Sequence, residues 1–272
     1  MSDRGRTRQV AAIGCGVLLT GLVIGAGVTT YFGRRLLHSI DSATDTLGQL
    51  NERFGSQADY VPPLDGRLAR ERVAVFLGVR QRLAPECDGF TGVFDQLEDT
   101  IHPTQETRPS SGRLFWLTVR TKKLPLQLAE YYDRRNVALL DAGMGLGEYT
   151  YLHVIAYTSW LRLRAETEDT ALRRELGPHA FRLVHAMHRR QLGALETQPA
   201  AAAPDYVAAL RREVARADAE PDTPPWFDGV PSGMAAALEP DAATLRDTFC
   251  AVLVSLELSN IDREDPLQPL RR

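Results

Sequence analysis

The stretch VAAIGCGVLLTGLVIGAGVTTYF, Val10–Phe32, decides the architecture, because it holds 23 residues without a formal charge. About 20 apolar residues in a helix cross the hydrocarbon core of a bilayer, so this stretch predicts a membrane-spanning helix. A cleaved signal peptide would have a shorter apolar region, with small residues before the cleavage site. A lipoprotein would need a bulky aliphatic residue at Ala12, three positions before Cys15. We therefore predict that residues 10–32 are a retained membrane anchor.

Arginines on the two sides of this span predict its orientation. Three precede it and two follow it: Arg4, Arg6, Arg8, Arg34 and Arg35. The more basic flank of a membrane helix usually faces the cytoplasm. We therefore expect residues 1–9 in the cytoplasm and the C-terminal part in the periplasm or outside the cell, as in a single-pass protein of a bacterial inner membrane. A cytoplasm-facing domain is the alternative.

The composition indicates a packed globular part downstream of the anchor. The chain has 272 residues, of which 44% are hydrophobic and 25% charged, enough for one domain or at most two. A net charge of -3 argues against a general nucleic-acid binder. Only Lys122 and Lys123 are lysines, so 30 of the 32 basic residues are arginines, which we interpret as a high-GC bacterial coding bias.

The three cysteines form no Cys-x-x-Cys pair, which argues against a zinc finger or a thioredoxin-like motif. Cys15 lies in the predicted anchor, whereas Cys87 and Cys250 lie in the soluble part. These two cysteines either form a disulfide in an oxidising compartment or stay as buried free thiols.

Two features near the membrane favour a parallel homodimer. In the anchor, Gly21 and Gly25 form a Gly-x-x-x-Gly pair with Gly14 one heptad earlier, a pattern that lets two helices approach closely. Downstream, a heptad seam with 3-4-3-4-3 spacing comprises Leu37, Ile40, Thr44, Leu47, Asn51 and Phe54. The alternative is that the seam packs an amphipathic helix against its own domain.

The soluble part is predicted to be helical throughout. A break at Gly55–Gly66, which contains two prolines, separates a juxtamembrane helical stalk at residues 33–56 from a helical domain at 57–260. Residues 261–272 are expected to be a flexible tail. Period-2 alternation of β-branched residues is almost absent, so we expect little or no sheet. The predicted fold class is all-α, with one N-terminal transmembrane helix plus an irregular soluble helical bundle.

Apolar residues at helical spacing give the expected helices. These are Leu68–Leu83, Phe90–Ile101, Arg113–Leu140 with a kink or restart at Pro125, Glu148–Arg164, Leu172–Leu195, Asp205–Ala217 and Thr244–Leu258. The proline-rich stretch Glu220–Pro240 is expected to be a surface loop.

The helix expected at Glu148–Arg164 carries the best candidate ligand site. Its polar and aromatic residues include Glu148, Tyr149, His153, Tyr157 and Trp160. One interpretation is a pocket for an apolar or cationic ligand, with His153 as the polar contact. The other interpretation is core packing, in which each polar tip finds a hydrogen-bond partner.

Two other patterns have simpler structural interpretations. The glycines of Gly143–Gly147 precede no Gly-Lys-Ser/Thr, and fit a helix C-cap and tight turn better than a phosphate loop. His185 and His188 share a helix face and could hold one metal or haem, but no carboxylate stands at ligand spacing. We interpret them as a solvated polar face, and we assign no metal ligand, no cofactor and no catalytic residue.

Two short motifs carry a resemblance to known proteins. One is Pro62-Pro63-Leu-Asp-Gly66 followed by Arg72-x-x-x-Phe76-Leu77-x-Val79-Arg80, and the other is Ala142-Gly143-Met144-x-Leu146-x-Glu148-Tyr149-x-Tyr151. Over residues 60–160 the chain resembles uncharacterised bacterial membrane-anchored or lipidated envelope proteins. The resemblance implies a helical, envelope-facing domain, and it implies no catalytic residue.

These observations predict a non-enzymatic binding or scaffolding module of a bacterial cell envelope. Its expected partners are the membrane through residues 10–32, an envelope protein and a second copy of the chain, with no nucleic acid. One alternative is a small-molecule-binding or catalytic bundle that uses the face of Glu148, Tyr149 and His153. The other is a cytoplasm-facing regulator.

Overall fold

The computed structural model describes residues 34–91, 124–162, 176–251 and 253. Every regular element within these residues is helical and none is a strand, which confirms the predicted all-α class. Within the same residues, no helix combines the length and the apolar character that a membrane crossing requires. The predicted anchor, with Gly14, Gly21 and Gly25, lies outside the described residues.

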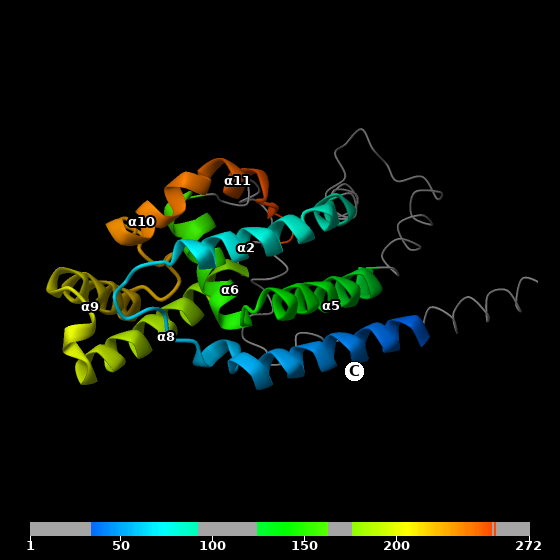
Figure 1. The fold of residues 1–272 in the computed structure, drawn as a ribbon, viewed down its shortest axis with the longest axis horizontal. Coiled ribbons are helices and arrows are strands. Elements are labelled where there is room, and N and C mark those ends of the chain that lie inside the picture. The colour runs from blue at the N-terminus through cyan, green and yellow to red at the C-terminus, as the bar shows by residue number, and fades with distance from the viewer. Residues whose placement is uncertain (1–33, 92–123, 163–175, 252, 254–272) are drawn as a thin grey trace, which may run out of the picture.

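Figure 1 shows the order of the helical elements along the chain. First come a helix over residues 34–54, η1 (Gln57–Asp59), α2 (Arg70–Leu83) and a short helix over 85–91. The middle part holds α5 (Leu124–Ala142), α6 (Leu146–His153) and η2 (Val154–Trp160), a π-helix that continues α6. The last part holds α8 (Leu176–Thr197), η3 (Pro199–Ala201), α9 (Pro204–Ala219), α10 (Ser232–Leu238), η4 (Glu239–Asp241) and α11 (Ala242–Asp247).

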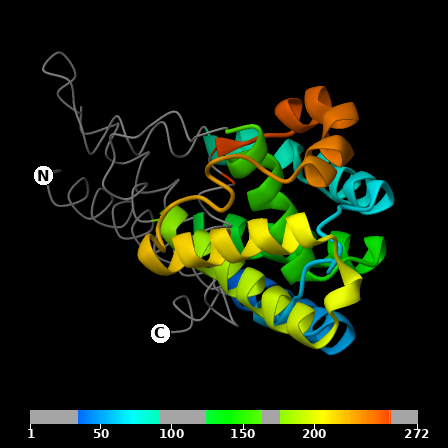
Figure 2. The ribbon, with the colours of Figure 1, turned by 90° about the vertical axis from the view of Figure 1, so that its left-hand side faces the viewer.

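The elements form an irregular bundle with two parts. In Figure 1, α5 lies between the 34–54 helix and α2, and the three run side by side. At the end of the bundle opposite residue 34, α8 and α9 form an antiparallel pair joined by η3 (Figures 1 and 2). Helix α6 contacts both α2 and α5, while α10 lies on α2 and α11 lies on η2.

The 34–54 helix packs on α5 instead of standing apart as a stalk. Its buried side chains belong to the common core and are Ile40, Ala43, Leu47 and Leu50. Polar groups beside them bridge the two helices. Asn136 Nδ2 donates to the Ala43 carbonyl at 3.1 Å, and Ser42 Oγ donates to Asp133 Oδ1 at 2.9 Å. An Arg35–Glu130 ion pair at 2.8 Å joins their exposed ends.

The expected helix at Arg113–Leu140 is described only from Leu124 onward. Pro125 is the second residue of the described part of α5. A kink or restart at Pro125 depends on the residues before Leu124, so it stays a prediction. Residues 113–123 lie outside the described residues.

The expected surface loop at Glu220–Pro240 is wrong over residues 232–238, which form α10. Met234, Ala237 and Leu238 have the i, i+3, i+4 spacing of a buried helix face and pack into the core. The surrounding prolines obscured this short apolar face, although Pro231 marks its N-cap.

Cys87 and Cys250 form a disulfide. Their Cα atoms are 5.9 Å apart, and the two residues are separated by 163 positions in the sequence. The bond ties the short helix after α2 to the segment that follows α11. Of the two alternatives left by the sequence, the structure therefore contains the bonded pair.

Candidate functional site

Most of the predicted ligand face lies in the core. Tyr149, His153 and Tyr157 are buried, and their ring centroids lie 5.4, 6.4 and 6.0 Å from that of Phe76 on α2. Trp160 is partly buried and packs against the same core. The arrangement matches the alternative interpretation of these residues, in which the aromatic stripe serves packing.

Arg80, which is 1% exposed, binds the Tyr149 hydroxyl of this face. Its guanidinium donates to Tyr149 Oη at 2.9 Å and to the Thr248 carbonyl at 3.1 Å, and it lies 5.5 Å from the ring centre of Tyr157. The Tyr157 hydroxyl lies 2.9 Å from Thr248 Oγ1. Arg80 therefore ties α2 to α6, to η2 and to the C-cap of α11.

Glu148 has a structural partner as well. Arg72 Nε donates to Glu148 Oε1 at 2.6 Å, and the same guanidinium donates to the Gly143 carbonyl at 3.1 Å. This hydrogen bond to Glu148 raises the pKa of Arg72. The Arg72–Glu148 pair links α2 to the turn at residues 143–145, in agreement with a structural role for its glycines.

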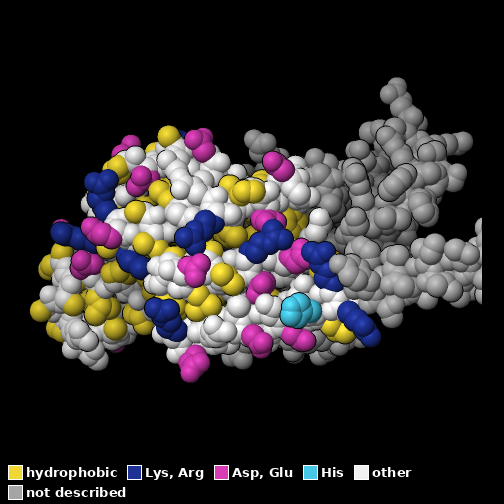
Figure 3. Space-filling view, turned by 45° about the vertical axis from the view of Figure 1, so that its right-hand side comes forward, with side chains coloured by type: hydrophobic (Ala, Val, Ile, Leu, Met, Phe, Trp, Pro, Cys, Tyr) yellow, Lys and Arg dark blue, Asp and Glu magenta, His cyan; other side chains and the backbone are white. Residues whose placement is uncertain are grey.

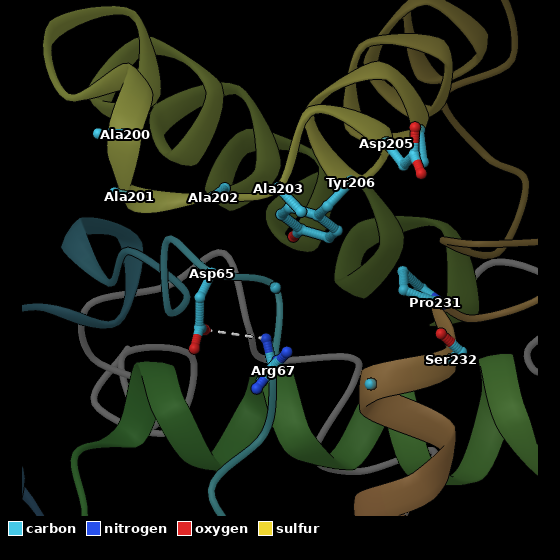
Figure 4. A pocket seen from close by; sticks show the side chains of 13 residues that line it. Asp65, Arg67, Ala200, Ala201, Ala202, Ala203, Asp205, Tyr206, Pro231 and Ser232 are labelled. Atoms are coloured by element: carbon cyan, nitrogen blue, oxygen red, sulfur yellow. Dashed lines mark hydrogen bonds between the residues drawn. The ribbon is translucent and has the colours of Figure 1, made fainter.

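A solvent-open cleft of about 770 Å³ lies elsewhere, between the loop at residues 65–67 and the first turns of α9 and α10. Figure 4 shows Asp65, Arg67, Tyr206 and Ser232 around it, with Asp65 Oδ1 accepting from the Arg67 N–H at 3.0 Å. Small residues leave the space open: Ala200, Ala201, Ala202, Ala203, Ala209 and Gly233. None of the predicted ligand residues lines this cleft.

Gly66 sets the shape of the cleft floor. Its φ of +70° is a left-handed conformation that favours glycine, and a Cβ there would collide with the Tyr206 ring. Burial raises the pKa of Tyr206 above its usual range, so its hydroxyl stays protonated. Beyond the cleft, basic and acidic side chains are interspersed over the described face in Figure 3. The cleft therefore combines a small-residue wall, one aromatic ring and a few charged groups.

A second candidate site, the His185–His188–Glu213 cluster, lies where α9 packs on α8. The three side chains are buried, at 1%, 0% and 5% exposure, and one potential ligand atom of each lies within 4.8 Å of the others. The interpretation of the two histidines as a solvated polar face is therefore wrong. They are covered because α9 and the segment at residues 220–231 pack over that face of α8.

Glu213 is held by three N–H donors, two from Arg216 and one from Trp226. Its Oε1 accepts from Arg216 at 2.6 Å and from the Trp226 N–H at 2.9 Å. Arg216 also donates to the Pro224 carbonyl at 3.0 Å. Trp226 has a φ of +53°, which is costly for a non-glycine residue. The Glu213 carboxylate thus holds the strained backbone at Trp226, in the segment that covers the cluster.

The hydrogen bond of His185 fixes the tautomer of its neutral form. Nε2 lies 3.0 Å from the Thr223 carbonyl, which can only accept, so Nε2 carries the proton. The lone pair of Nδ1 is then available, 3.7 Å from Glu213 Oε1. Burial lowers the pKa of His185, partly opposed by the hydrogen bond to Thr223 and by the Glu213 charge.

His188 is the least satisfied polar group of the cluster. Among the described residues neither ring nitrogen has a hydrogen-bond partner, and the ring packs edge-on at 5.8 Å from Tyr151 and 5.2 Å from Trp226. Burial, and then the charges of His185 and Arg216, lowers the pKa of His188 to about 3. The neutral ring has one N–H donor and one nitrogen acceptor without a hydrogen bond. Burying each such group unpaired costs about 1–3 kcal/mol of stability.

The sequence held one signal for this cluster. The buried residues of α9 are Tyr206, Leu210, Glu213 and Ala217, spaced 4-3-4. Glu213 thus occupies an apolar position of a helical stripe, where an acid indicates a buried, partnered carboxylate. Its partner histidines are on another helix, so sequence spacing around His188 could not reveal the carboxylate.

The predicted dimer residues divide between two environments. Ile40 and Leu47 are buried in the chain's own core, Asn51 is partly buried, and Leu37 is 61% exposed. Packing within one chain therefore accounts for the burial of Ile40 and Leu47. Pairing of two chains through the exposed remainder and the glycine stripe stays a prediction.

The comparisons with known proteins add no relative to this description. No protein-family model, no curated protein and no solved structure matches the chain.

Proposed function

We propose that the chain is a non-enzymatic binding module of a bacterial cell envelope, tethered by residues 10–32 and facing away from the cytoplasm. The observation that carries this proposal is the Cys87–Cys250 disulfide. Disulfides persist in the periplasm and outside the cell, whereas cytosolic reductants keep thiols reduced. The disulfide favours the outward orientation over the cytoplasm-facing regulator, in agreement with the arginine distribution around the predicted anchor.

The cleft is the surface that we assign to binding. Its lining includes residues from the first turns of α9 and α10. These helices lie at the opposite end of the bundle from residue 34, to which the predicted anchor would connect (Figure 1). A module held at one end and hollowed at the other can present its binding surface away from the bilayer. The catalytic alternative has less support, because Tyr149 and His153 are buried and Glu148 is paired with Arg72.

The compartment is tested by the oxidation state of the cysteines in cells. In a Cys15→Ser background, a thiol-reactive polymer is applied to acid-quenched cells with and without reductant. We expect no adduct without reductant and two adducts after reduction. A compartment-sensitive reporter fused after Arg272 provides an independent readout. Reduced cysteines together with a cytoplasmic reporter signal would refute the orientation.

The binding surface is tested by site-specific photo-crosslinking in native membranes. A photoreactive residue replaces Ala203, which lines the cleft, or Ala208, which is exposed on α9 outside it. We expect a discrete adduct from position 203 alone, and its loss when Ala202→Trp fills the cleft. Equal adducts from both positions, or an adduct that survives Ala202→Trp, would contradict binding at the cleft.

A further inference from the structure

We propose that His185, His188 and Glu213 bind one divalent transition-metal ion, of which Zn²⁺ fits the donor set best. The site would join α8, α9 and the segment at residues 220–231 from inside the bundle. This metal site is separate from the cleft, since none of the three side chains lines the cleft.

The geometry is close to what a metal ion requires. Three atoms that all lie within 4.8 Å of one another can share a centre within about 2.8 Å of each, whereas Zn²⁺ binds nitrogen and oxygen at about 2.0–2.2 Å. Each ligand therefore has to move by less than about 1 Å, which small side-chain rotations provide. His185 and His188 are three residues apart on one helix, so their rings already face the same side.

The lone pair of His185 Nδ1 is placed to bind a cation. With Nε2 donating to the Thr223 carbonyl, Nδ1 directs its lone pair toward the carboxylate region, 3.7 Å from Glu213 Oε1. Two electron-rich atoms at this separation repel each other unless a proton or a metal ion lies between them. A backbone carbonyl on the distal nitrogen of a ligating histidine is also the usual second-shell arrangement.

His188 independently indicates a ligand. Its ring is fully buried, and neither nitrogen has a hydrogen-bond partner among the described residues. A single proton between His185 and Glu213 would leave His188 as it is. A metal ion would be bound by one of the nitrogens of His188 as well, so it accounts for more of the cluster than a proton does.

Glu213 would supply the negative charge that two neutral imidazoles lack. Arg216 and the Trp226 N–H hold its carboxylate in place, as second-shell donors commonly do for ligating carboxylates. Arg216 already pairs with this carboxylate, so the guanidinium and the metal ion would share the single negative charge of Glu213. Two imidazoles and one carboxylate suit Zn²⁺ rather than Ca²⁺ or Mg²⁺, which prefer oxygen ligands alone. The fourth position would be left to water.

Metal binding is tested on the full chain with Cys15→Ser, purified in detergent without a histidine tag and with the disulfide intact. The protein is stripped with a chelator, dialysed and titrated with Zn²⁺ by calorimetry. We expect about one equivalent to bind and the thermal midpoint to rise with free Zn²⁺, as for any ligand of the native state. No binding to the folded chain, or binding without a rise in the midpoint, would overturn the proposal.

The location is tested by His188→Gln and Glu213→Gln, with His38→Gln as the control because His38 is exposed on the 34–54 helix. We expect His38→Gln to bind like the parent and both cluster variants to lose binding while keeping their helical spectrum. Unchanged binding in both variants would place the metal elsewhere and overturn the assignment.

A measurement without substitutions covers the case in which the cluster variants do not fold. X-ray absorption of the Zn²⁺-loaded parent protein should show only nitrogen and oxygen ligands, with the scattering pattern of two imidazoles. Sulfur in the first shell, or no imidazole scattering, would refute the ligand set.

Discussion

Replacing Phe76 by alanine tests whether the predicted ligand face is core. The side chain is fully buried, and its ring contacts those of Tyr149, His153 and Tyr157 at centroid distances of 5.4, 6.4 and 6.0 Å. Truncating a buried Phe to alanine costs about 3–5 kcal/mol, and losing three ring pairs favours the upper part of this range. We therefore expect Phe76→Ala to lower the free energy of unfolding by about 4–5 kcal/mol.

The assay is urea unfolding followed by circular dichroism, with the disulfide intact. For a slope of about 3 kcal/mol per molar urea, the midpoint should fall by about 1.5 M. Phe227→Ala is the matched control, since Phe227 is 50% exposed and should change stability by less than about 0.5 kcal/mol. If Phe76→Ala shifts the midpoint no more than the control, the face is not core and a pocket there becomes credible again.

Three further predictions follow from the contacts described above. Glu148→Gln breaks a partly buried pair with α2 and should cost about 1.5–3 kcal/mol in urea unfolding, whereas Asp141→Asn breaks an exposed pair and should cost less than about 1 kcal/mol. Gly66→Ala should destabilise by about 1–3 kcal/mol more than Gly55→Ala, because both have positive φ but only the first collides with a ring on α9; equal losses would refute the collision. Burial lowers the pKa of His188 from 6.5 to about 3, so the unfolded chain binds more protons between these values. Without metal, stability should be constant above pH 7 and fall below pH 6.5 by up to about 1.4 kcal/mol per pH unit, and a flat profile from urea midpoints would contradict this.

Helical periodicity was sufficient to locate α2 and α9, because their apolar residues form stripes that must face a core. It placed the ends within two residues: α2 begins at Arg70 against an expected Leu68, and α9 begins at Pro204 against Asp205. It failed at α10, where seven residues among prolines give too short a pattern to separate from a loop.

Contacts between residues far apart in the chain could not be predicted from the sequence. Cys87 and Cys250 are separated by 163 positions, so either state of the thiols agreed with the spacing. His188 and Glu213 meet only because α9 folds back along α8, and Arg80 reaches Tyr149 only because α2 crosses α6. The apolar face of a helix predicts which residues point into the core. Which helix packs against that face depends on the arrangement of the whole bundle.

The attachment of the 34–54 helix to α5 has a mechanical consequence. A pull on residue 34 along the helix axis loads in shear the contacts that Arg35, Ser42 and Ala43 make with α5. Contacts loaded in shear yield together, whereas a sideways pull would peel them one after another. Tension applied at residue 34 along this axis would therefore move the domain as a unit before detaching the helix.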